Sequence, residues 1–223
     1  MTKSDIITFC TEKLGITDAA AQAQAGRFVD LRHSMIWNEH DWRQARWQET
    51  IAVAAGTQDV TLDAQCELVR GARWAGQQEL LALNDAAALA LDAPGYDQPG
   101  PVLAFTPLGK DTAGRPVIRL QRKPAKAGTL LVFGKRRPVP LGANDTPPIP
   151  GEEQALCEWV LGDLYEWLRQ LGKAQVFFQK GIALVERMRQ LEAEQSGEVR
   201  RIVPYVQQLD GDGCAGDSYN PLA

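Results

Sequence analysis

The stretch PGEEQALCEWVLGDLYEWLRQLGKAQVFFQKGIALVERMRQLEA, residues 150–193, carries the strongest periodic signal in the chain. Apolar side chains first recur there at helical spacing, at Leu156, Val160, Leu164, Trp167, Leu168 and Leu171. Gly172 is expected to end or kink that helix. A second set of small and apolar residues follows, at Phe177, Gly181, Leu184, Met188 and Leu191. We therefore predict two helices, over 152–171 and 173–195, that pair as an antiparallel hairpin.

The N-terminal residues also have a helical pattern. Ser4 is a candidate N-cap of a first helix, and Gly15 is a natural end for it. Asp18 is the candidate N-cap of a second helix that runs to about Trp37. The expected apolar stripe of this second helix consists of Phe28, Leu31, Met35 and Ile36.

The middle of the chain is typical of β-structure. Short runs rich in apolar and β-branched residues lie at 47–53, 59–62, 68–74, 102–106, 115–120 and 128–133. The runs 102–106 and 115–120 flank a Gly- and Asp-containing turn, which predicts a hairpin. An Ala-rich segment over 84–91 predicts a short helix. The proline-rich stretch from Pro138 to Pro150 is expected to form neither helix nor central strand.

This order of helices, strands and helices favours an α+β fold over an alternating parallel sheet. We expect the N- and C-terminal helices, residues 1–45 and 151–197, to form one helical bundle. Residues 46–150 are expected to form a central antiparallel β domain, either a sandwich or a small barrel. Residues 198–223 are expected to form an extended C-terminal arm.

The composition argues against several classes of protein. Of 223 residues, 44% are apolar and 23% are charged, values ordinary for a soluble globular protein. No apolar run reaches the roughly 18–20 residues that a membrane helix needs, and the first residues lack the pattern of a signal peptide. We therefore expect synthesis in the cytoplasm and no membrane association. The net charge of -4 argues against a dedicated nucleic-acid-binding protein.

The search for catalytic, cofactor or metal motifs gives no candidate. His33 and His40 lie outside any metal-binding pattern and are expected at the surface or at a helix end. The paired carboxylates Glu152 and Glu153 are expected to complement the dipole at a helix N-terminus. Of the four cysteines, Cys10, Cys66 and Cys157 are expected to be small buried residues and Cys214 a thiol in the tail. Their spacing does not fit a zinc site.

One stretch has an unusual charge. Residues 115–137 contain eight basic side chains and no acidic one: Arg115, Arg119, Arg122, Lys123, Lys126, Lys135, Arg136 and Arg137. Three interpretations remain open: contact with DNA phosphates, docking to an acidic partner protein, and solvated strand faces that protect sheet edges. Three tryptophans, Trp37, Trp42 and Trp47, fall every five residues and are expected to anchor the helices on the sheet.

Several segments together resemble a known family. Early helices run into WNEHDW at 37–42, and the strand that begins at Trp47 leads to GTQDVTL at 56–62. GRPVIRL at 114–120 is followed by TLLVF at 129–133, and Ile149-Pro150 precedes the last two helices. This order resembles the head-to-tail connector adaptor proteins of tailed bacteriophages, including the tail tubular protein A group. The resemblance covers about residues 1–195.

The resemblance implies a structural protein of the virion neck, made in the host cytoplasm and without catalytic residues or cofactors. Such adaptors form a ring, commonly of twelve copies, below the portal protein. The ring extends the channel through which viral DNA passes without sequence specificity, and it seats the next tail, nozzle or stopper protein. The last two helices would then also form contacts between copies, through heterologous closure of the ring.

Partner-binding residues are expected in two places. In the basic stretch they are Arg115, Arg119, Arg122, Lys123, Lys126, Arg136 and Arg137. In the arm, which would become ordered on assembly, they are Ile202, Val203, Tyr205, Val206 and Tyr219. Two alternatives remain open. One is a nucleic-acid-binding module that uses 115–137. The other is a small enzyme such as a cell-wall hydrolase, which would need two carboxylates in a cleft, for example Glu67 with Asp85.

Overall fold

The computed structural model of the chain describes residues 1–76, 80–82 and 99–196. The elements, in chain order, are α1 (Lys3–Leu14), α2 (Ala19–Glu39), a 3-10 turn (Arg43–Ala45), β1 (Arg46–Val53), β2 (Asp59–Thr61), β3 (Cys66–Trp74), β4 (Leu81–Ala82), β5 (Ala104–Lys110), β6 (Pro116–Leu120), β7 (Gly128–Arg136), α4 (Glu152–Trp167) and α5 (Leu171–Ser196). The α+β class is therefore confirmed. The predicted helix over 84–91 lies outside the described residues.

The strands form two sheets. One has the order β1-β7-β3 and is antiparallel, with Thr50 opposite Leu131 in the β1–β7 ladder. The other has the order β2-β6-β5-β4, and β5 and β6 form the predicted antiparallel hairpin. The short β4 pairs parallel with β5, which the expectation of a purely antiparallel domain did not include. Buried side chains from both sheets, such as Ile118 of β6 and Leu130 of β7, share one hydrophobic core.

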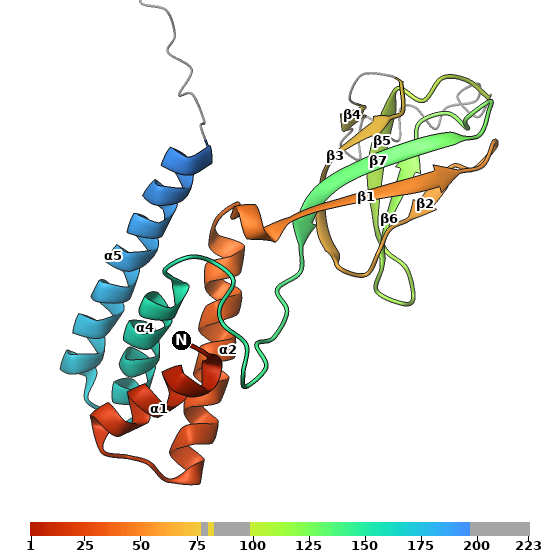
Figure 1. Cartoon of the computed structure of the whole chain (residues 1–223). Helices are drawn as coiled ribbons and strands as arrows, with labels where there is room; N and C mark the ends of the chain where they lie inside the picture. The colour runs from red at the N-terminus through yellow and green to blue at the C-terminus, as the bar shows by residue number, and fades with distance from the viewer. Residues whose placement is uncertain (77–79, 83–98, 197–223) are drawn as a thin grey trace, which may run out of the picture.

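The four helices of the described residues share a second core (Figure 1). Helix α4 lies at its centre, because almost every side chain from Ala155 to Leu164 is buried. Helices α4 and α5 form the predicted antiparallel hairpin. The first helix begins two residues earlier than expected. Thr2 is its N-cap and forms a capping box with Asp5, while the Ser4 hydroxyl donates to the carbonyl of Ala143.

The predicted end of α4 is wrong by a few residues. The helix stops at Trp167, and Arg169 takes the left-handed conformation with a φ of 59°. The N–H of Arg169 donates to Glu166 O and that of Gln170 to Tyr165 O, which are the two hydrogen bonds of a Schellman motif. Gly172 therefore lies inside α5. Three residues of the predicted stripe are consequently exposed: Trp167, Leu168 and Leu171.

The predicted stripe of α2 is also wrong in part. Leu31 is 53% exposed and Met35 is 44% exposed. The buried face is instead the row Ala21, Ala25, Val29, His33 and Ile36. Only the first part of this row, Ala21 and Ala25, is small, which lets that part of α2 lie close to its neighbours.

Helices α4 and α5 are fitted together by reciprocal contacts between glycine and aromatic residues. A Cβ added to Gly181 of α5 would lie 2.0 Å from Trp159 Cδ1, and one added to Gly162 of α4 would lie 2.6 Å from the Phe178 ring. Each glycine therefore provides the space for an aromatic side chain of the other helix.

Replacing Gly181 with alanine is expected to lower the free energy of unfolding by about 1–3 kcal/mol, because Trp159 must move. Denaturant unfolding measures the change. The matched control is Gly172→Ala in the same helix, where an added Cβ would meet nothing within 4 Å. Alanine is there expected to be neutral or stabilising by up to about 1 kcal/mol. Equal effects of the two variants would contradict this packing.

The helical lobe (α1, α2, α4 and α5) meets the β lobe (β1–β7) near the end of α2. The Trp37 indole N–H donates to Arg136 O at 2.8 Å, and the Lys135 ammonium donates to His40 O at 3.2 Å. Arg70 of β3 forms an ion pair with Asp41. Trp37 and Trp42 lie in the helical core and Trp47 in the β core. The helices therefore do not pack on the sheet as a layer, and of the three tryptophans Trp37 donates a hydrogen bond across the junction, while Trp42 donates to Ile36 O within the helical lobe. Within the described residues, no helix is both long and apolar enough to cross a bilayer.

Candidate docking surfaces

A groove of about 680 Å³ runs between α2 and α5. Its lining consists of Leu31, Arg32, Ser34, Met35, Asn38, Glu39, Trp159, Phe178 and Ile182. Leu31, Met35 and Ile182 are each about half exposed there, which leaves three apolar side chains of two helices facing solvent. Contiguous exposed apolar surface of this kind is typical of a docking site.

The floor of the groove is electrically neutral. The Arg32 guanidinium binds both carboxylate oxygens of Asp163, with Nε 2.8 Å from Oδ2. The same group lies 5.3 Å from the ring centre of Trp159 and 5.0 Å from that of Phe178. The cation is therefore held between two aromatic rings and neutralised by a carboxylate, so the floor favours an apolar occupant.

The end of the groove near the end of α2, which is its upper end in the view of Figure 1, is acidic. Arg189 of α5 lies 2.7 Å from a carboxylate oxygen of Glu39 and 2.6 Å from one of Glu186. One guanidinium thus faces two carboxylates, both about half exposed, and the trio carries a net negative charge. An occupant with an apolar segment next to a basic residue would match this end of the groove.

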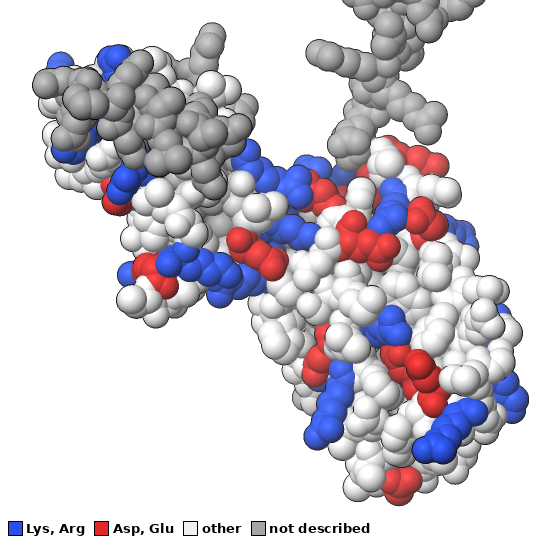
Figure 2. Space-filling model, turned by 180° about the vertical axis from the view of Figure 1, so that it is seen from behind, with Lys and Arg blue, Asp and Glu red and all other residues white. Residues whose placement is uncertain are grey.

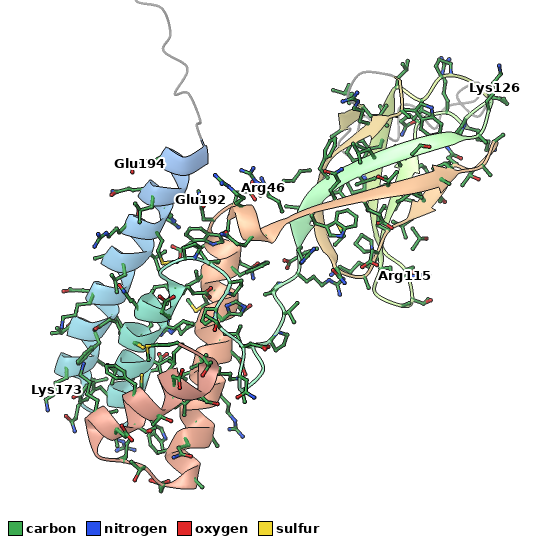
Figure 3. The ribbon with its side chains drawn as sticks, viewed as in Figure 1. Arg46, Arg115, Lys126, Lys173, Glu192 and Glu194 are labelled. Carbon is green, nitrogen blue, oxygen red and sulfur yellow. The ribbon has the colours of Figure 1, made fainter. Side chains whose placement is uncertain are left out.

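The side of α5 that faces α1 has a different character. Lys13 lies 5.2 Å from the ring centre of Phe9 and 5.5 Å from that of Phe177, and Lys180 lies 5.1 Å from Phe177. Tyr165 stacks on Phe177 at 5.1 Å. Lys173 also lies over the Tyr165 ring. We call the surface formed by these residues the lysine–aromatic face: Phe9, Lys13, Tyr165, Lys173, Phe177 and Lys180. Figure 3 places Lys173 at the opposite end of α5 from Glu192 and Glu194, so the helix is basic at its start and acidic near its end.

The basic stretch 115–137 does not form one surface. Arg115 and Lys126 lie at opposite ends of the β lobe (Figure 3). Arg115 holds Asp111 within its own turn through its backbone N–H and its Nε, and these contacts lower the pKa of Asp111. Arg119 binds Asp59 of the adjacent strand through two hydrogen bonds, which lower the pKa of that carboxyl. Part of the stretch therefore consists of strand residues paired across the sheet.

The end of the stretch stabilises the junction between the lobes. Lys135 is buried, and burial lowers the pKa of its ammonium group. Arg137 donates to Gly114 O at 2.6 Å, while Arg136 is exposed. Arg122 and Lys123 are half-buried near the other end of the lobe. The predicted partner-binding residues of the arm, Ile202, Val203, Tyr205, Val206 and Tyr219, lie outside the described residues, as does Cys214.

Lys and Arg also gather where the lobes meet (Figure 2). Besides Arg136, this region contains Arg43, Arg46 and Arg70, and all four are exposed. The backbone N–H of Arg43 and its side chain both contact Glu192 of α5. Sequence analysis missed this group because its members are spread over some 90 positions and only the fold brings them together.

The prediction that His33 lies at the surface or at a helix end is wrong. Its side chain is 2% exposed and lies in the helical core. Its Nδ1 is hydrogen-bonded to Oε1 of Glu152, whose side chain is completely buried, and the Ile149 N–H donates to the other carboxylate oxygen. Glu152 therefore joins α2 to the start of α4 instead of facing solvent. His40 is the C-terminal cap of α2, as the alternative of a helix end predicted.

No catalytic arrangement emerges from the described residues. Glu67 lies beside Lys135, and Asp85, its suggested partner, is outside the described part of the chain. Among residues 1–76, 80–82 and 99–196, no three His, Cys, Asp or Glu side chains are grouped so that they could hold a metal ion.

The three described cysteines are buried, as expected. Burial raises the pKa of the Cys66 thiol to about 11, and a hydrogen bond with Cys157 together with burial raises the pKa of Cys10. Thiolate is the reactive form, so we expect iodoacetamide at about pH 8 to leave Cys10 and Cys66 unmodified in the folded protein. Peptide mass spectrometry with and without urea measures this. Rapid native labelling of either thiol would contradict its burial.

A sequence model of the family described as SU10 adaptor protein matches residues 1–203. No curated protein matches the sequence. The matched residues contain both lobes, the α2/α5 groove and the lysine–aromatic face.

Proposed function

The chain belongs to the SU10 adaptor protein family of phage head-tail adaptors, and from this premise we propose that it forms a ring beneath the portal protein of a virion. The family match over residues 1–203 is the observation that carries the proposal. The ring would extend the DNA channel at the virion neck and seat the next tail, nozzle or stopper protein. It would act by association and not by catalysis.

Two faces of the helical lobe support contact between copies. The α2/α5 groove is apolar with an acidic end, and the lysine–aromatic face on the other side of α5 is apolar and basic. We propose that the lysine–aromatic face of one copy meets the groove of the next. Two different faces per copy give a heterologous contact, which closes into a ring when the rotation permits.

The other parts of the molecule would have separate roles. We propose that residues 1–45 and 151–197 act as one domain at the ring contact, 46–150 as a β domain toward the tail, and 198–223 as an arm to the portal. Exposed basic residues such as Lys126 and Arg136 would meet acidic neighbouring proteins. Tight phosphate contacts would hold DNA through counterion release, so a channel for DNA of any sequence should have few of them.

A charge exchange tests the proposed contact. Lys180→Glu is expected to weaken association of copies about tenfold, because a basic group is lost opposite the acidic end of the groove. Adding Glu186→Lys on the groove side is expected to restore part of the loss. Lys110→Glu, an exposed lysine of the β lobe, is the control. Sedimentation velocity in the presence of portal protein reads out the assembly, and a Lys180→Glu variant that assembles normally would contradict this contact.

The proposal as a whole is tested by native mass spectrometry of the chain mixed with the portal protein of the same phage. A complex with several adaptor copies for each portal ring is expected. A portal that stays free of the chain at micromolar concentration would contradict the adaptor function.

A further inference from the structure

The α2/α5 groove is open along its length in the described residues and leads toward the end of α5. Helices α2 and α5 run in the same direction, from the lower end of the helical lobe in Figure 1 to its junction with the β lobe. At the upper end lie Glu39, Arg189 and Glu186. Lower down lie the apolar residues Met35, Leu31 and Ile182. Helix α5 ends at Ser196, and 27 residues of the chain follow it.

We propose that residues 200–206 of the same chain, RRIVPYV, occupy this groove when the protein is free. They combine two arginines with four apolar side chains, Ile202, Val203, Tyr205 and Val206. An apolar, neutral floor with an acidic end needs an occupant of this composition, with its basic part at the acidic end.

The length of the chain fits this position. Ile182 lies about 21 Å below Ser196 along the axis of α5, at the helical rise of 1.5 Å per residue. Six residues of extended chain, 197–202, span about 20 Å. A chain that turns back after Ser196 therefore brings Ile202 to the level of Ile182. Gly197 directly follows the helix, and glycine is the residue type that most readily reverses the chain at such a point.

The charges match at the same register. Glu186 lies about 15 Å below Ser196 on α5, at the level that Arg200 and Arg201 reach. There, Arg189 is the partner of both the Glu39 and the Glu186 carboxylate, which leaves one negative charge unbalanced. This charge attracts one further guanidinium, which Arg200 or Arg201 would supply. Val203 and Tyr205 then follow along the apolar part of the groove, toward Phe178 and Leu31.

Occupancy of the groove would have a consequence for assembly, and this consequence alone rests on the proposed function. The segment would cover the apolar side chains that a neighbouring copy is proposed to contact. If residues 200–206 bind the portal protein instead, the groove becomes open to a neighbouring copy at the site of ring assembly. A free chain would thus carry little exposed apolar surface there.

Methyl NMR of the full chain, without portal protein, tests the occupancy directly. The methionines are Met1, Met35 and Met188, so a sample with labelled methionine methyl groups has a simple spectrum. Met35 lines the groove and is 44% exposed when the groove is open, whereas Met188 is 6% exposed in the core. A methionine placed by Val176→Met, at a position 51% exposed outside the groove lining, provides the open reference.

With a soluble paramagnetic agent, we expect the Met35 methyl to be protected nearly as well as Met188. In Ile202→Asp, its broadening is expected to rise to that of the Val176→Met reference. Leu209→Asp, the same kind of change outside residues 200–206, is expected to leave Met35 protected. An unprotected Met35 in the unchanged protein would overturn the proposal, and so would protection that survives Ile202→Asp. Protection that disappears on tenfold dilution would also overturn it, because the occupant would then be a second copy.

Discussion

Replacing Glu152 with alanine is expected to lower the free energy of unfolding by about 3–5 kcal/mol, among the largest effects of any single substitution in the helical lobe. Glu152 is fully buried, is bonded to Nδ1 of His33 and accepts a hydrogen bond from the Ile149 backbone. Its removal leaves buried polar groups of α2 and of the segment before α4 without this partner. Urea unfolding monitored by circular dichroism measures the change.

The neighbouring carboxylate provides the control. Glu153 is half-buried in the first turn of the same helix, and Glu153→Ala is expected to cost less than about 1 kcal/mol, the value of a charge at a helix N-terminus. A double-mutant cycle with His33→Ala isolates the pair: the two losses should be strongly non-additive. Additive losses, or equal effects of Glu152→Ala and Glu153→Ala, would show that the pair does not join α2 to α4.

Ile182→Asp is expected to abolish assembly of copies on the portal at concentrations where the unchanged protein assembles. The side chain is 55% exposed in the groove, so an aspartate there disturbs folding little but places a charge in the proposed apolar contact. Removal of a central apolar contact typically costs 2 kcal/mol or more of binding free energy, about thirtyfold or more in affinity. Analytical ultracentrifugation with portal protein reads out the loss.

Leu68→Asp is the control for that variant. Leu68 lies on β3 in the β lobe and is 52% exposed, away from both the groove lining and the lysine–aromatic face. Its assembly is expected to remain within about threefold of the unchanged protein, which corresponds to less than 1 kcal/mol. If both aspartate variants assemble alike, the groove is not the contact between copies.

The sequence predicted the helices and strands well because their signals are local. Asp18 accepts hydrogen bonds from the N–H groups of Ala20 and Ala21, and Gly15 has the left-handed conformation that ends α1. Most of the expected runs became strands with nearly the expected bounds, but the run at 102–106 is a strand over Ala104–Lys110. The misplaced end of α4 has a local cause as well: Arg169 adopts a conformation that favours glycine, so the true helix end carries no glycine signal.

The candidate site was predicted less well because it depends on contacts between distant segments. His33 and Glu152 are 119 positions apart, and neither residue alone indicates that they meet in the core. The groove arises because Leu31 and Met35, taken from the pattern as core residues, lie on the face of α2 that no other described helix covers. An apolar stripe records which residues avoid water, but it does not tell a core contact from a contact with another molecule.

The basic stretch shows the opposite error, since proximity in sequence suggested proximity in space. Its residues lie on or next to β6 and β7 and on the turn between them. Lys126 in the turn is far from Arg115, whereas Arg137 returns to Gly114 beside Arg115. Arg119 pairs with Asp59, 60 positions away, and Lys135 is buried at the junction of the lobes. The assignment of Arg115, Arg119, Arg122, Lys123, Lys126, Arg136 and Arg137 to partner binding stays a prediction.

The central claim, that the chain is a portal-docking adaptor, is tested most directly by negative-stain electron microscopy of the chain co-expressed with the portal protein of the same phage. The account predicts class averages with a ring of added density at one end of the portal. Side views would show which lobe of the adaptor faces the portal. Portal particles without added density, together with a chain that sediments separately at micromolar concentration, would contradict it.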